Sequence, residues 1–83
     1  MEHLQTRKGS PDVWFTIHGE PTRAGEWSCV LRFFGLDPEG PPKTRTNPAA
    51  EFPLTVNAAS REQAVVVCGD LAYDYIENGT EPR

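Results

Sequence analysis

The chain has 83 residues, of which 37% are hydrophobic and 24% charged. A chain this short builds one domain with a thin core and little room for an enclosed substrate cavity. Its formal net charge of −4 disfavours direct contact with nucleic acid or an anionic membrane, because both attract cationic side chains. No apolar run approaches the roughly 20 residues of a membrane span, and the polar start lacks the apolar segment of a signal peptide. We therefore expect a cytoplasmic protein whose acidic balance permits a basic partner.

The polar residues 1–11 predict a flexible arm, ahead of a single domain over residues 12–79 and a short tail over residues 80–83. Inside the domain, Gly35–Glu51 is a proline-rich connection of unusual length, and connections of that length are often functional or mobile. Within this connection, Lys43–Thr46 could form a short edge strand, because the nearby proline and charged residues suit an edge position.

Alternation of apolar and polar residues predicts two strands, Asp12–His18 and Glu26–Phe34, joined by a hairpin loop over residues 19–25. The two strands pair through matching faces, because a slip of one residue would move every apolar side chain to the wrong face. The core face of this hairpin then consists of Val13, Phe15, Ile17, Trp27, Cys29, Leu31 and Phe33.

A third strand over Phe52–Ala58 precedes the clearest element, a helix over Ser60–Asn78. Ser60 is the expected N-cap, Gln63 completes a capping box, and Gly79 follows the last helical residue. Apolar residues at helical spacing predict a stripe that packs on the sheet: Ala64, Val67, Cys68, Leu71, Ala72 and Tyr75. The expected fold class is α+β. It has an antiparallel sheet of three strands, or of four if the connection adds one, and one C-terminal helix on one face of the sheet.

The residues that could carry catalysis are few. The histidines are His3, in the predicted arm, and His18, which falls on the face opposite to Cys29. Cys29 and Cys68 are expected to be buried, reduced thiols, and no cysteine or histidine has the spacing of metal ligands. We expect no enzyme activity, no catalytic or metal-binding residue and no cofactor.

Asp70, Asp74 and Glu77 recur at i, i+4 and i+7 and share one face of the predicted helix. They occupy its C-terminal half, where the helix dipole disfavours negative charge, and no lysine or arginine stands four residues away. The row is either an ordinary solvated face or, with Tyr73 beside it, a partner-binding surface that meets arginines or imitates a row of phosphates.

A second candidate surface is the face of the hairpin opposite to the core. Trp14, Arg32 and Phe34 gather there, and exposed aromatic and arginine side chains are favoured in protein interfaces. The alternative is that the long connection Gly35–Glu51 folds over this face.

The segment Leu54–Ala64 carries a strand that ends in small residues and a capped helix that begins Ser60-Arg61-Glu62. It resembles small phage-encoded anti-CRISPR proteins and, more weakly, HicB-like antitoxin domains. The first resemblance implies a non-enzymatic inhibitor that blocks a basic nucleic-acid-binding surface of a CRISPR-Cas effector. The alternative is an antitoxin-like regulatory module. The antitoxin-like module would dimerise, whereas the inhibitor would be a monomer or a homodimer with a protein partner.

Overall fold

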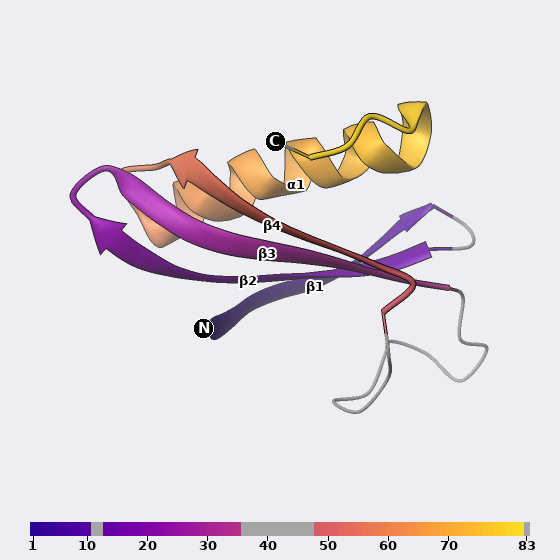
Figure 1. Ribbon diagram of the computed structural model, residues 1–83, viewed down its shortest axis with the longest axis horizontal. Helices are drawn as coiled ribbons and strands as arrows, with labels where there is room; N and C mark the ends of the chain where they lie inside the picture. Colours follow the sequence, from indigo (N-terminus) through magenta and orange to yellow (C-terminus); the bar gives the residue numbers. More distant parts are fainter. Residues whose placement is uncertain (11–12, 36–47, 83) are drawn as a thin grey trace.

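The computed structural model describes residues 1–10, 13–35 and 48–82. In these residues one antiparallel sheet precedes one helix (Figure 1). The strands follow chain order across the sheet, so the expected α+β class is confirmed. The elements are β1 (Glu2–Ser10), β2 (Val13–Arg23), β3 (Glu26–Gly35), β4 (Ala50–Asn57) and α1 (Arg61–Asn78).

Strand β1 differs from the flexible arm predicted over residues 1–11. It pairs antiparallel with β2 and supplies the fourth strand at the sheet edge. The guanidinium of Arg61, at the start of α1, lies 3.1 Å from a carboxylate oxygen of Glu2 and donates to the His3 carbonyl at 3.4 Å. Leu4 packs against the core. The fourth strand considered in the sequence, Lys43–Thr46, lies outside the described residues.

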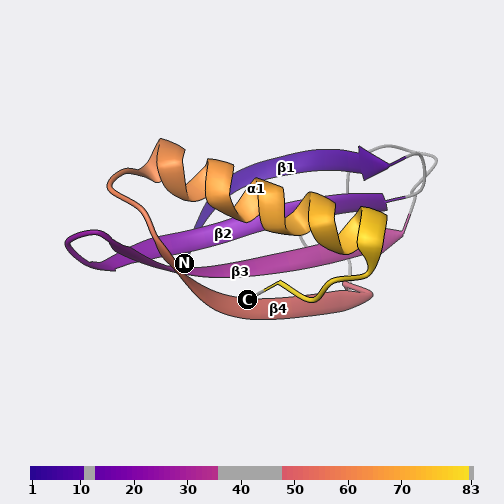
Figure 2. The same ribbon diagram turned by 90° about the horizontal axis from the view of Figure 1, so that it is seen from above.

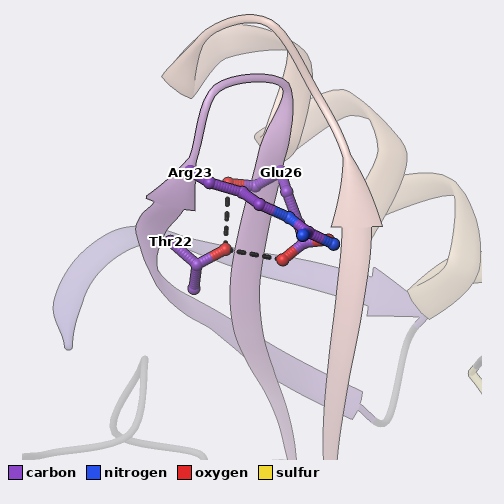
Figure 3. A network of polar contacts seen from close by, with 3 residues as sticks. All are labelled: Thr22, Arg23 and Glu26. Carbon is purple, nitrogen blue, oxygen red and sulfur yellow. Dashed lines mark hydrogen bonds and ion pairs between the residues drawn. The ribbon is translucent and has the colours of Figure 1, made fainter.

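The β2–β3 hairpin has the predicted register, with Phe15 opposite Phe33. Strand β2 is longer than the sequence suggests, because residues 19–23 continue the pairing and leave a turn of two residues, ending at Gly25 with φ 77°. Strand β3 begins at Glu26 as predicted and extends one residue further, to Gly35. Figure 3 shows the contacts that close this end. Glu26 accepts a hydrogen bond from the Thr22 hydroxyl at 2.8 Å and forms an ion pair with Arg23 at 2.8 Å.

Both caps of α1 are formed by the predicted residues. The Ser60 side chain accepts a hydrogen bond from the Gln63 backbone N–H at 3.1 Å. The Gln63 side chain accepts one from Ala59 at 2.5 Å, one residue before the position of a standard capping box. At the other end, Gly79 has φ 71° and donates to the Tyr75 carbonyl at 2.9 Å. The helix therefore begins and ends where local hydrogen bonds satisfy its free backbone groups.

Helix α1 lies across one face of the sheet, and the described residues place no helix on the other (Figures 1 and 2). Tyr75 closes the core near the helix end, with its ring centroid 4.6 Å from that of Phe33 and 4.9 Å from that of Phe52. Of the predicted inward stripe, Val67, Leu71 and Tyr75 are only half-buried and pack against the border of the core. The buried cluster is Phe15, Ile17, Cys29, Leu31, Phe33, Val56, Ala58, Ala64, Cys68 and Ala72.

Strand β1 approaches α1 closely at two glycines. A Cβ on Gly9 would collide with the Cδ1 atom of Ile76 and lie 3.2 Å from the ring of Phe15. A Cβ on Gly69, in the middle of the helix, would lie 3.3 Å from the terminal nitrogen Nη1 of Arg7. Gly9 therefore faces packed hydrocarbon, whereas Gly69 faces the mobile end of a long side chain.

The core assignment predicts a difference between two leucines. Leu31 is fully buried, so Leu31→Ala should lower the free energy of unfolding by about 2–5 kcal/mol in urea denaturation. Leu71→Ala should cost clearly less, because that side chain is already partly hydrated. Thr55→Ala, at an exposed position of β4, is the control and should change stability least. Equal losses for Leu31→Ala and Leu71→Ala would contradict the packing described here.

The two glycines predict opposite effects of adding one methyl group. Gly69→Ala should leave stability unchanged or raise it by up to about 1 kcal/mol, because alanine favours the helix and Arg7 can move aside. Gly9→Ala should destabilise, by about 1–3 kcal/mol, because it overpacks the interface between β1 and α1. Thermal melting of the two variants measures both effects. A melting temperature of Gly9→Ala equal to or higher than that of Gly69→Ala would contradict the close packing of Gly9 against α1.

Candidate partner-binding surfaces

The cysteines lie in the core, where the sheet meets the helix. Cys29 in β3 and Cys68 in α1 are both fully buried and free of disulfide. Burial raises the pKa of both thiols, that of Cys68 to about 12. Because the thiolate is the nucleophilic form, neither sulfur is placed or ionised to attack a substrate.

The histidines lie together on the face of the sheet away from α1. His18 in β2 pairs with His3 in β1, and their ring centroids are 5.3 Å apart in an edge-on arrangement. Cys29 faces the core and His18 the opposite side, as the predicted register requires. Among residues 1–10, 13–35 and 48–82, no three or more His, Cys, Asp or Glu side chains gather in a way that could hold a metal ion.

The acidic row of α1 is exposed along its length. Asp70, Asp74 and Glu77 all reach solvent, and the last turn of the helix contains no basic residue. Asp74 accepts a hydrogen bond from the Asn78 amide at 3.1 Å. In the part of the chain that the structure describes, Asp70 and Glu77 have neither a hydrogen bond nor an ion pair. Val66, one turn before Asp70, leaves 58% of its surface exposed.

Tyr73 does not belong to this exposed row, although the helical pattern predicted it to be one of the partner-binding residues. It is half-buried, and its ring meets that of Phe15 edge-on at 5.5 Å. The aromatic ring therefore stabilises the contact between helix and sheet. A helical projection could not separate this position from its exposed neighbours, because it lies at the border between the two faces.

The second candidate surface is the outer sheet face, defined here as the side of β1–β4 that points away from α1. The register brings Trp14 opposite Phe34, and Arg32 lies one row further along β3, so the predicted grouping of these three is correct. Their exposure differs, because Trp14 is partly exposed whereas Phe34 is only 7% exposed. The alternative, that the connection Gly35–Glu51 covers this face, concerns residues that lie mostly outside the described part of the chain. The Arg32 side chain is 39% exposed and contacts Glu51 at 2.7 Å, a partner that the sequence did not indicate.

An apolar pocket of about 630 Å³ opens between the sheet and the C-terminal end of α1. Aromatic rings and small residues dominate its lining, with Phe33, Phe34 and Tyr75 as the largest side chains. None of the lining residues that belong to the described part of the chain carries a charge, so these residues offer apolar contact rather than an ionised group.

Comparison with known proteins finds no matching family model, no similar curated protein and no similar solved structure. In the described part of the chain, no helix is sufficiently long and apolar to cross a membrane.

The histidine pair predicts a pH dependence of stability. Partial burial, followed by the nearby charges of Arg32, His3 and the amino terminus, lowers the pKa of His18 below its usual 6.5. In the unfolded chain, the His18 imidazole therefore takes up a proton near pH 6.5, whereas in the native chain it stays neutral at that pH. As a result, the native state loses stability as the pH falls from 6.5 towards the lower pKa of the native chain.

Urea denaturation of the wild type and of His18→Gln between about pH 5 and pH 8 tests this. The difference in stability between the two proteins should change below about pH 6.5, with the wild type losing more. Carboxylates titrate equally in both proteins, so they cancel in the difference. Parallel pH profiles would contradict the proposed role of His18.

Proposed function

We propose that this chain is a non-enzymatic protein-binding inhibitor that binds a basic surface of its partner through the acidic row of α1. The observation that carries the proposal is the exposed row Asp70, Asp74 and Glu77, on a helix whose last turn contains no basic residue. Glu77 lies in that last turn, where the negative end of the helix dipole makes a carboxylate unfavourable. A local arrangement that costs stability without a structural return is most often retained for function.

The charges have the geometry of an interface with a cationic partner. At 1.5 Å per residue, Asp70 and Glu77 are about 10 Å apart along the helix axis, a span that two or three arginine side chains can cover. Because Asp70 and Glu77 have no ion pair among the described residues, a partner's guanidinium groups would not have to compete with internal cations. Val66, exposed one turn earlier, adds an apolar contact at the edge of the same surface.

The particular class that we propose is an inhibitor of a CRISPR-Cas effector, acting in the cytoplasm. Effectors of this kind hold nucleic acid in positively charged channels, and a rigid row of carboxylates resembles the phosphates that such a channel binds. The small size and the net charge of −4 suit a protein that occupies a channel without performing chemistry there.

The binding mode predicts the effect of removing charge without changing shape. In Asp70→Asn/Glu77→Gln, the partner captured by the tagged wild type should associate more slowly, because charge complementarity acts mainly on the association rate. Raising the salt concentration should weaken the wild type more than the variant, since ions screen exposed charges. Asp74 is left unchanged because it accepts the Asn78 hydrogen bond.

The matched control is Glu20→Gln/Glu62→Gln, which removes the same charge from exposed positions outside the acidic row. It should retain the wild-type association rate. Surface plasmon resonance at low and high salt separates the two results. Equal rates for Asp70→Asn/Glu77→Gln and the wild type at low salt would show that the row is only a solvated face.

The partner class has its own test. The chain is expressed in bacterial strains that carry active CRISPR-Cas immunity of different types, and phage plaquing is measured with and without it. An inhibitor of an effector should restore plaquing in at least one immune strain and leave strains without CRISPR-Cas unchanged. If no immune strain changes, the CRISPR-Cas assignment is wrong, while the binding experiment still decides whether the acidic row binds a basic protein.

A further inference from the structure

Two neighbouring side chains on the outer sheet face bury polar atoms without a hydrogen-bond partner. They are the indole nitrogen Nε1 of Trp14 and the hydroxyl oxygen Oγ1 of Thr16. The two residues are separated by one position in β2, so their side chains share this face. Thr16 as a whole is only 7% exposed, so bulk water does not replace the missing partner.

Two adjacent donors left unpaired in this way are unusual. Buried polar groups are nearly always hydrogen-bonded, and an orphaned donor keeps the full cost of its lost hydration. The Trp14 indole N–H can only donate, and the Thr16 hydroxyl can donate as well. An acceptor group that carries more than one oxygen has a hydrogen-bond site for each of them.

The charges around these donors favour a negatively charged acceptor. Cross-strand pairing places Lys8 beside Trp14 and Arg32 beside Thr16. The Nε atom of Arg32 donates to Glu51 at 2.7 Å, but a guanidinium has further N–H donors at its far end. Two cations and two neutral donors therefore occupy neighbouring register positions on the outer sheet face, and the carboxylate of Glu51 lies beside Arg32.

We propose that Trp14, Thr16 and Arg32 form a binding site for an oxyanion, a carboxylate or phosphate oxygen, with Lys8 adding positive charge at its edge. The site is separate from the acidic row, because α1 covers the opposite face of the sheet (Figures 1 and 2). It therefore does not depend on the function proposed above. Trp14 and Arg32 are partly exposed, so an oxyanion approaches the site from the side of these two side chains.

The indole N–H groups provide a direct readout. In a ¹H–¹⁵N NMR spectrum, Trp14 and Trp27 each give one indole signal, and Trp27 lies elsewhere, on β3 opposite Val56. Titration with inorganic phosphate and, separately, with sodium acetate should shift the Trp14 signal with saturation and leave that of Trp27 in place. Stronger binding of one probe identifies a phosphate or a carboxylate as the preferred group.

Three variants distinguish a binding site from a general charge effect. Thr16→Val keeps the shape and removes the hydroxyl, and Arg32→Gln removes the cation, so each should weaken binding about tenfold or more. Arg23→Gln is the matched control, since it also removes an arginine paired with a glutamate, at the far end of the hairpin. It should bind both probes like the wild type.

Thermal melting of Thr16→Val adds an independent readout. The melting temperature should stay the same or rise, because the variant removes an unsatisfied polar atom from a buried position. The proposal is overturned if neither probe gives a saturable shift of the Trp14 signal, if both indole signals shift together, or if Thr16→Val binds like the wild type. A marked fall in its melting temperature would also overturn it, since the hydroxyl would then have a structural partner.

Discussion

A four-stranded sheet has two faces, and in the described residues one helix covers one of them (Figure 2). All of the fully buried large side chains, Phe15, Ile17 and Leu31 among them, therefore point to the side of α1. The helix can approach because its inward positions are small: Ala64, Cys68 and Ala72 are all fully buried. The hydrophobic contact between this stripe and the sheet is the constraint from which the other features follow.

The same arrangement separates two surfaces. The outward side of α1 carries carboxylates and no cation in its last turn. The outer sheet face carries Lys8, Arg32 and two histidines together with the carboxylates of Glu20 and Glu51. The protein-binding function that we propose uses the first surface, and the oxyanion site that we propose uses the second.

Much of this was readable from the sequence because two periodicities are clear. Alternation fixed the pairing of Phe15 with Phe33, and Ser60, Gln63 and Gly79 marked the ends of α1. Strand β1 was missed because Leu4 is its only large apolar residue and a register shift follows His3. Its place depends on tertiary contacts, such as that between Glu2 and Arg61, which no local pattern encodes. The unpaired donors Trp14 and Thr16 were equally invisible, because a missing partner is a property of the folded neighbourhood.

The central claim is that the carboxylates of α1 form the surface that meets a protein partner. Carbodiimide labelling of Asp and Glu side chains, read by mass spectrometry, tests it on the wild-type chain alone and in complex with the partner it captures. The account predicts that Asp70 and Glu77 lose labelling in the complex, while the equally exposed Glu20 and Glu62 keep it. Unchanged labelling of Asp70 and Glu77 in a saturated complex would contradict the claim.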